Sequence, residues 1–320
     1  MIDYRSAVFA ESTKATYRTH RKRYFTFCDL MRVAPAPISP ELLCLYIAYL
    51  ARTLKASSVP LYLNFVSLLH KELGLPDPVL GNWLISSTLT GVRRLKGSPP
   101  VPKLPITIDM LVSIRTRLNL SLSLHASFWA ICLTAFFGLF RKSHLLPISS
   151  GKFSVALHFC KDDFIPFSGG YLVRVRWSKT IQFHQRVVFI PLVRIPSSPL
   201  CPVAAISQAL ALCASDPPQA AAFTWRDSAG PSSRVFTYRR FMRLFRLFLS
   251  QAGYEASAFG THSFRRGGAT LALQAGIPIS TIQLLGDWKS DAVLLYLTLP
   301  VQSRVSAQVS ISNHITHLTF

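Results

Sequence analysis

Acidic residues are scarce in this 320-residue chain. Aspartate and glutamate number 14 against 35 lysines and arginines, which leaves a net charge of +21 and a pI near 10.3. Half of the residues are hydrophobic, so the sequence predicts a packed globular protein with a basic surface and not a disordered basic tail. Nucleic acid is the leading partner class, because neutralising a phosphate backbone gives affinity through counterion release. An anionic membrane surface is the competing partner.

Long apolar runs and a secretion leader are missing as well. The longest uncharged apolar run, Phe128 to Phe140, is too short to span a bilayer and predicts a buried helix. No positively charged leader with an apolar core and a cleavage site opens the sequence, so we expect no secretion. The sequence therefore predicts an intracellular protein that does not span a membrane. Since nucleic acid is the preferred partner, we expect no membrane partner.

Close pairs of cysteines are absent too. The cysteines lie mostly in apolar surroundings, which favours reduced core residues over a disulfide frame or a zinc site. They are Cys28, Cys44, Cys132, Cys160, Cys201 and Cys213. No carboxylates or histidines stand at metal-ligand spacing, and we interpret His314 and His317 as incidental. We predict no metal and no cofactor.

A period of 3.6 residues dominates residues 1–96 and predicts a small all-helical domain. Helices are expected at residues 11–31, 40–50, 57–73 and 78–95, with Ser12 and Thr13 capping the first. Basic side chains gather on the first and last helices, at Lys14, Arg18, Arg21, Arg93, Arg94 and Lys96. We interpret them as contacts to a DNA backbone, with an ordinary solvated face as the alternative.

Prolines separate this domain from the remainder of the chain. Residues 97–106 predict an extended linker, so we place the domain boundary there and assign residues 107–320 to a second domain. The apolar run from His125 to Phe140 predicts a central buried helix in that domain. Arg141 follows at the break before the next helix, which Ser143 is expected to cap.

The hydrophobic period changes from 3.6 to 2 between residues 151 and 191. Alternation in residues 171–177 and 186–190 predicts two strands joined by a turn, with Lys179 at or next to that turn. Further helices are expected at residues 107–118, 199–214 and 237–251, and a short strand at 220–226. The predicted fold class is therefore mainly α with a small antiparallel β-sheet (α+β).

A row of arginines marks the expected helix at residues 237–251. Arg239, Arg240 and Arg243 lie along it, while phenylalanines and leucines supply its other side. The row is a candidate DNA-facing surface, and a generic basic face is the alternative.

The stretch around His262 carries the strongest signal for chemistry. His262 and Arg265 are three residues apart, so on a helix they share one face and can both reach a single anion. They lie in the first turn, where unpaired N–H groups and the helix dipole favour a phosphate. Ser290 is expected to cap a later helix, which would place Tyr296 near its second turn. Taken alone, Tyr296 would be interpreted as a core or rim aromatic.

Several motifs occur in the order and spacing of the tyrosine recombinase family, and the chain resembles that family over nearly its whole length. They are Gly138-Leu-Phe-Arg141-Lys-Ser143, the hairpin Lys179, His262-Ser-Phe-Arg265, Leu285-Gly286-Asp-Trp288 and Tyr296. The helical first domain resembles the family's core-binding domain, which makes the second domain the catalytic one. The run from His262 to Tyr296 most resembles recombinases of eukaryotic mobile elements of the DIRS, Ngaro and Crypton groups.

The resemblance implies a role for each matching residue. Arg141 and Arg265 would hold the scissile phosphate, with His262 as the histidine between them. Lys179 would protonate the leaving 5′ oxygen. Tyr296 would be the nucleophile, and because a phenol with a pKa of about 10 attacks poorly at neutral pH, it must lose its proton as it reacts.

Two positions depart from the family pattern. Where many members have a second histidine directly after the glycine, this chain has Asp287, with Trp288 one place later. We assign Trp288 to that role, its indole N–H donating to a phosphate oxygen. His144 replaces the acidic residue commonly found three positions after the first arginine.

The resemblance implies an enzyme that cuts and rejoins double-stranded DNA for mobile-element integration or excision, in the nucleus. A tail such as residues 301–320 commonly docks on a neighbouring protomer in the family, which implies a tetramer on two DNA sites; packing within the same chain is the alternative. A DNA-binding protein that no longer cuts DNA and a type IB topoisomerase-like enzyme are the rival functions.

Overall fold

The computed structural model describes residues 8–97, 99, 102–178, 181, 186–227, 232–297, 305, 308–310 and 312. The chain divides into two compact units, Met1–Val101 and Pro102–Phe320. This division falls within residues 97–106, the stretch interpreted as a linker. In the described part of the chain, no helix combines the length and apolar character that crossing a bilayer requires.

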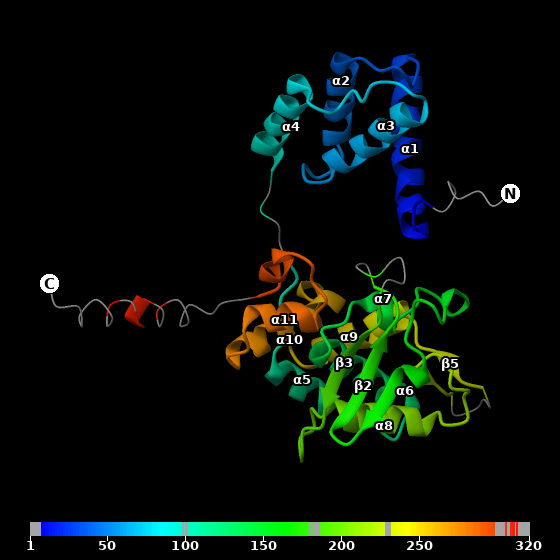
Figure 1. The fold of residues 1–320 in the computed structure, drawn as a ribbon, viewed down its shortest axis with the longest axis vertical. Helices are drawn as coiled ribbons and strands as arrows, with labels where there is room; N and C mark the ends of the chain where they lie inside the picture. Colours follow the sequence, from blue (N-terminus) through cyan, green and yellow to red (C-terminus); the bar gives the residue numbers. More distant parts are fainter. Residues whose placement is uncertain are drawn as a thin grey trace. The chain divides into compact units, whose positions relative to one another are not determined.

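In its described residues, the first unit contains the four predicted helices, the last of which begins at Trp83 and not at Pro78. They are α1 (Glu11–Met31), α2 (Pro40–Ala51), α3 (Val59–Glu72) and α4 (Trp83–Lys96), coloured blue to cyan in Figure 1. The prediction that Ser12 and Thr13 cap α1 is wrong. The helix already begins at Glu11, because the Ala10 carbonyl accepts the amide of Lys14 at 3.0 Å.

Aromatic side chains fill the interior of the first unit. Tyr24, Phe27 and Tyr46 are buried, and the rings of Tyr24 and Tyr46 meet edge-on at 5.1 Å between centroids. The Tyr24 hydroxyl donates to the Pro35 carbonyl at 2.6 Å, so its polar end is satisfied inside the protein. This apolar interior leaves the basic side chains of α1 and α4 at the surface.

The second unit is built around one buried helix. Its main elements are α5 (Ile108–Arg115), α6 (Ser123–Phe137), α7 (Lys142–Leu145), β1 (Phe164–Phe167), β2 (Gly170–Val175), β3 (Val188–Val193), α8 (Pro202–Leu212), β4 (Thr224–Trp225), β5 (Arg234–Val235), α9 (Tyr238–Gln251), α10 (Thr261–Gln274) and α11 (Ile279–Leu285) (Figure 1). Every residue from Ala126 to Phe136 is buried, as the apolar run predicted. The helix ends at Phe137 and not at Phe140, because Leu139 takes a left-handed conformation with a φ of 51°.

Strands β1, β2 and β3 form an antiparallel sheet in sequence order. In the register of β2 and β3, Val173 faces Ile190, and both are buried. The fold is therefore mainly α with small antiparallel sheets, as predicted. Strand β1 escaped prediction because it is short and contains Pro166. The strand expected at 220–226 is shorter than predicted, since only Thr224–Trp225 pairs with β5.

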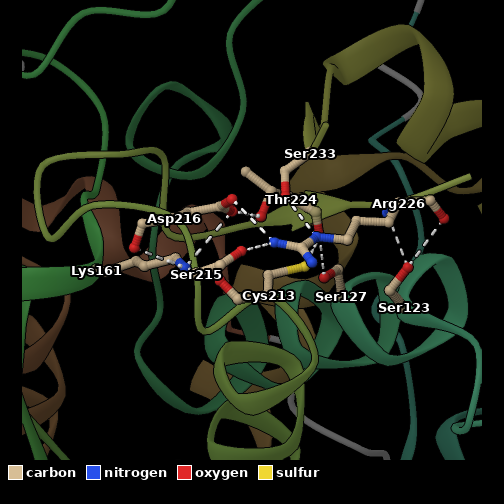
Figure 2. Close-up of polar contacts among 9 residues, drawn as sticks. All are labelled: Ser123, Ser127, Lys161, Cys213, Ser215, Asp216, Thr224, Arg226 and Ser233. Atoms are coloured by element: carbon tan, nitrogen blue, oxygen red, sulfur yellow. Dashed lines mark hydrogen bonds and ion pairs between the residues drawn. The ribbon is translucent and has the colours of Figure 1, made fainter. Parts of the chain in front are cut away.

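A polar network joins the chain after α8 to strand β4 (Figure 2). The Asp216 carboxylate accepts a hydrogen bond from Thr224 Oγ1 at 2.8 Å. It also lies 3.5 Å from Lys161 Nζ and 3.5 Å from an Arg226 nitrogen. Burial acts to raise the pKa of Asp216, but hydrogen bonds from Ser233 and Thr224 and the charge of Lys161 outweigh it and lower that pKa. The carboxylate therefore stays ionised and neutralises the cations around it.

We predict that Asp216→Asn lowers the free energy of unfolding at pH 7 by about 2–4 kcal/mol, because it leaves Lys161 and Arg226 without their counter-charge. The carboxylate's contribution is full above its unfolded pKa of about 3.9 and is lost as the pH falls through the lower folded pKa. Urea unfolding at pH 7 and at pH 3 checks this. The exposed Asp109→Asn should cost under about 1 kcal/mol. Equal unfolding free energies for wild type and Asp216→Asn at pH 7 would contradict the expectation.

Candidate active site

Two glycines bring α10 close to α6 and to the segment before α5. A Cβ on Gly268 would lie 2.0 Å from the Phe136 carbonyl oxygen, and one on Gly267 would lie 2.0 Å from the Ile106 carbonyl oxygen. Both obstacles are backbone atoms, which cannot swing aside as a flexible side chain can. Only glycine permits this close approach. The approach in turn determines how deeply the nearby Arg265 is buried.

Arg265 is a buried cation, only 1% exposed. Its Nη1 donates to the Leu139 carbonyl, and its Nη2 donates to the Gly286 carbonyl at 2.6 Å. The guanidinium carbon lies over the Trp288 ring at 3.6 Å from the centroid. Burial and then the charge of Arg141 lower the pKa of Arg265 to about 9, so the guanidinium stays protonated at neutral pH. The carbonyls and the π face offset the cost of burying this charge.

Tyr296 and His262 lie within contact of each other. Tyr296 Oη is 3.3 Å from His262 Nδ1, and the Tyr296 ring centroid is 5.4 Å from the guanidinium carbon of Arg265. The half-buried Tyr296 therefore stands between a possible proton acceptor and a permanent cation.

The local structure before Tyr296 differs from the prediction. Ser290 caps the segment as expected, but the segment is a 3₁₀ helix, η5 (Asp291–Leu295), and Tyr296 is its C-terminal cap residue. The prediction of an α-helix with Tyr296 near its second turn is thus wrong. Arg266 Nη1 donates to the Leu295 carbonyl at 2.5 Å, which takes up an acceptor that a continuing helix would need.

His262 remains accessible to solvent, yet its environment disfavours the protonated form. Partial burial of the ring, followed by the positive charges of Arg265, Lys142 and Arg141, lowers the pKa of His262 below 6.5. The imidazole is therefore mainly neutral at pH 7 and can accept a proton.

Arg141 lies at the start of α7, beside this group. Its Nη2 donates to the Asp287 carbonyl at 3.5 Å. The prediction that Ser143 caps α7 is wrong, because the helix begins at Lys142 with Arg141 as its N-cap residue. The position of Arg141 at the break after the buried helix is as predicted.

The two guanidinium groups retain unused donors. Arg141 Nη1 and Arg265 Nε are buried, and among the described residues neither has a hydrogen-bond partner. Buried polar groups are normally paired, so unsatisfied cationic donors near Tyr296 indicate a site for an anion.

His144 lies beneath the same group of cations and is 4% exposed. Burial first, and then the charges of Arg141 and Arg265, lower the pKa of His144 to about 3. The imidazole is thus neutral at pH 7, and it supplies none of the negative charge that an acidic residue would bring to this position.

Trp288 is 8% exposed and packs on Arg265 and on the Tyr296 ring, whose centroid lies 5.2 Å away. Its observed contact is therefore with the π face over the guanidinium. Donation by its indole N–H to a phosphate stays a prediction.

The structure brings most of the predicted catalytic residues together. Those with described positions are Arg141, His262, Arg265, Trp288 and Tyr296, all in the second unit. Lys179 lies outside the described residues. Of the tail, Val305 and Val309 are described and exposed, whereas the remainder of the predicted docking stripe lies outside the described residues.

The arginines of α9 divide into two kinds. Arg239 and Arg243 are exposed and, with Arg246, line a groove of about 790 Å³. Arg240 lines it too, but its guanidinium stacks on the Trp225 ring at 4.1 Å. The exposed members can face a phosphate backbone, while Arg240 is partly held by the protein.

The predicted basic residues of the first unit lie mostly at its surface. Those exposed on α1 and α4 are Arg18, Arg21, Arg93, Arg94 and Lys96. Lys14 pairs with Glu11 at 2.7 Å, and Lys96 also donates to the Ala51 carbonyl at 2.9 Å. The pair with Glu11 offsets the charge of Lys14, whereas the carbonyl contact occupies one donor of Lys96 and leaves its charge in place.

One group of possible metal ligands was not foreseen. In the described residues, Cys160, Asp162 and Asp163 offer ligand atoms within 4.8 Å of one another. The buried Asp163 carboxylate, however, already pairs with Arg174 at 2.9 Å and with Arg176 at 2.5 Å. These arginines neutralise the charge that would attract a cation.

Sequence reasoning missed the role of Asp287 as a binding partner within the protein. Its carboxylate accepts a hydrogen bond from Ser178 at 2.7 Å and pairs with Arg186 at 2.5 Å. The only signal in the sequence was an acidic residue directly after Gly286. Its partners stand more than a hundred positions earlier, which no local pattern reveals.

Known proteins resemble the chain in sequence and in fold. No protein-family model matches the chain. It is similar to a curated integrase/recombinase, a xerD homologue of Selenomonas ruminantium, with 24% identity over 304 residues that cover 89% of this chain and 80% of the relative.

Solved structures share the fold. The XerH site-specific recombinase bound to difH substrate matches with a TM-score of 0.58 and 14% identity over 92% of this chain and 78% of that one. The lambda integrase (75–356) dimer bound to a core site matches with a TM-score of 0.56 and 16% identity over 92% and 91%. The Tn1549 transposon integrase in complex with transposon right end DNA matches with a TM-score of 0.57 and 12% identity over 95% of each chain.

The chain thus shares its fold with these site-specific recombinases and integrases.

We predict that Gly268→Ala destabilises the second unit by about 1–3 kcal/mol or more, because the new methyl group would meet the Phe136 carbonyl. Thermal unfolding followed by circular dichroism measures this. Gly151→Ala is the matched control, since nothing lies within 4 Å of the position that its methyl group would take. An unchanged melting temperature for Gly268→Ala would show that α10 does not rest on α6 this closely.

Proposed function

We propose that the protein is a site-specific DNA recombinase that cuts and rejoins strands through a 3′-phosphotyrosyl intermediate. One observation carries the proposal. Tyr296 Oη lies 3.3 Å from a neutral His262, beside the buried cation Arg265. A DNA-binding module has no use for a phenol poised beside a base and a cation.

The residues suit each part of the reaction. The Tyr296 oxygen attacks the scissile phosphorus while His262 accepts the phenolic proton. Arg141 and Arg265 donate to the non-bridging oxygens and stabilise the charge that grows on them in the transition state. The bond from phosphorus to the 5′ oxygen breaks, and the predicted acid Lys179 supplies the proton that this oxygen takes up.

Double-stranded DNA is the proposed substrate. The net charge of +21, the exposed arginines of α1 and α4, and the groove along α9 all offer cations to a phosphate backbone. The structural relatives were solved with DNA, which supports the same choice.

The biological setting is proposed from the resemblance of residues 262–296 to recombinases of eukaryotic mobile elements. We infer integration or excision of such an element in the nucleus. Assembly as a tetramer on two DNA sites through the tail stays a prediction, as does catalysis without a metal.

A covalent adduct tests the proposal directly. The full chain is incubated with a pool of nicked duplexes of randomised sequence, and DNA that resists removal by detergent is recovered and sequenced. A nick just downstream of the cleavage point lets the short fragment that carries the new 5′ hydroxyl diffuse away, so the intermediate accumulates. We expect an adduct that is enriched for one sequence and is abolished by Tyr296→Phe.

Other results would favour the rival functions. DNA binding without any adduct would support a protein that no longer cuts. An adduct without sequence enrichment, together with relaxation of an unrelated supercoiled plasmid, would support the topoisomerase-like activity. An adduct that survives in Tyr296→Phe would assign the nucleophile to another residue.

We predict that the rate of adduct formation falls as the pH drops through the pKa of His262, below 6.5, because protonation removes the acceptor of the phenolic proton. The rate should level off above that pKa. Single-turnover rates between pH 5 and 8, on the duplex most enriched in the pool, measure the profile. His262→Asn should form the adduct slowly, and its rate should not fall with pH in the same range. If that variant shows the same pH dependence as wild type, His262 is not the group that accepts the proton.

A further inference from the structure

A carboxylate lies among the cations of the site. Asp287 stands in the turn between α11 and η5, with a left-handed φ of 51°, and its side chain is 14% exposed. One carboxylate oxygen accepts the Ser178 hydroxyl at 2.7 Å, and the other pairs with Arg186 at 2.5 Å. The turn is thereby bonded to a different part of the fold.

These two partners come from opposite sides of a hairpin. Ser178 follows β2 and Arg186 precedes β3, just beyond the last ladder pair, Val175 with Val188. Ser178 is fully buried, whereas the Arg186 side chain is 50% exposed. Asp287 therefore holds both chain segments where they leave the sheet.

The backbone of the same turn orients the two arginines of the active site. The Gly286 carbonyl accepts Arg265 Nη2 at 2.6 Å, and the Asp287 carbonyl accepts Arg141 Nη2 at 3.5 Å. Trp288, the next residue, covers the Arg265 guanidinium. Any shift of this turn would move the acceptors of both cations at once.

We propose that Asp287 is a positioning residue whose carboxylate anchors the turn at residues 286–288 to the base of the β2–β3 hairpin and so fixes Arg265 and Arg141. The inference rests on the proposed strand cleavage and deepens it. Asp287 acts through the arginines and takes no part in the proton or phosphoryl transfer itself.

The ion pair with Arg186 and the hydrogen bond with Ser178 contribute unequally to the stability of the anchored turn. A half-exposed ion pair such as that with Arg186 contributes little, because water screens it. The contact with the buried Ser178 is the stronger one, because a hydrogen bond shielded from water is strengthened by the low local dielectric. Asparagine retains an acceptor for Ser178 and tolerates the left-handed conformation, so it should retain most of the anchor.

The test measures the rate of adduct formation by the full chain at saturating DNA, using the nicked duplex most enriched in the pool, and DNA affinity by mobility shift. We expect Asp287→Ala to lower the rate about 100-fold while Kd changes under about threefold, because misplaced groups cost rate more than binding. Asp287→Asn should stay within about fivefold of wild type. Ser178→Ala combined with Asp287→Ala should be no slower than Asp287→Ala alone.

The matched control is Asp162→Ala, which removes a carboxylate paired with Arg174 in the same unit. It should leave the rate unchanged. A wild-type rate in Asp287→Ala, a loss in Asp287→Asn as deep as in Asp287→Ala, or additive losses in the double variant would each overturn the proposal.

Amide hydrogen exchange without DNA separates this inference from the proposed function. Asp287→Ala should speed exchange at residues 284–288 and 175–178, whereas Asp162→Ala should not alter residues 284–288. If wild type forms no adduct with any duplex, the proposed function fails. Unchanged exchange in Asp287→Ala overturns the anchor whether or not the protein cleaves DNA.

Discussion

A guanidinium removed from water must find its acceptors inside the protein, and Arg265 finds them in two loops far apart in sequence. The Leu139 carbonyl comes from the end of α6 and the Gly286 carbonyl from the end of α11. Trp288 covers the remaining face. These contacts tie three helices and the segment leading to Tyr296 into one arrangement. Together they offset the cost of burying this charge.

Several of the few acidic residues form ion pairs within the second unit. Asp163 pairs with Arg174 and Arg176, Asp216 with Lys161, and Asp287 with Arg186. Buried or half-buried cations are thus neutralised inside the fold. In the described part of the chain, the exposed arginines of α9 form no comparable ion pairs. This difference explains how a strongly basic protein can be both packed and attractive to a polyanion.

Local patterns predicted the helices and the order of the site residues, but not their geometry. The run before Arg141 and the spacing of His262 and Arg265 were sufficient to place these three residues on the right elements. The 3₁₀ helix before Tyr296 was not predictable, because it depends on Arg266 capturing a carbonyl nearly thirty residues away. Strand lengths were misjudged for a similar reason, since pairing partners decide where a strand ends.

The anchoring role of Asp287 shows the same limit. The residues next to Asp287 in sequence do not indicate that Ser178 and Arg186 are its partners. These contacts can be identified only from the folded structure, in which the sheet and the turn lie together. Gly267 and Gly268 are similar, because the atoms that forbid a side chain there belong to distant backbone.

The most direct measurement is the site of covalent attachment. The trapped protein–DNA adduct is digested with nuclease and protease, and the peptide that retains a nucleotide is identified by mass spectrometry. The account predicts a phosphodiester on the oxygen of Tyr296. Attachment to any other residue would contradict it.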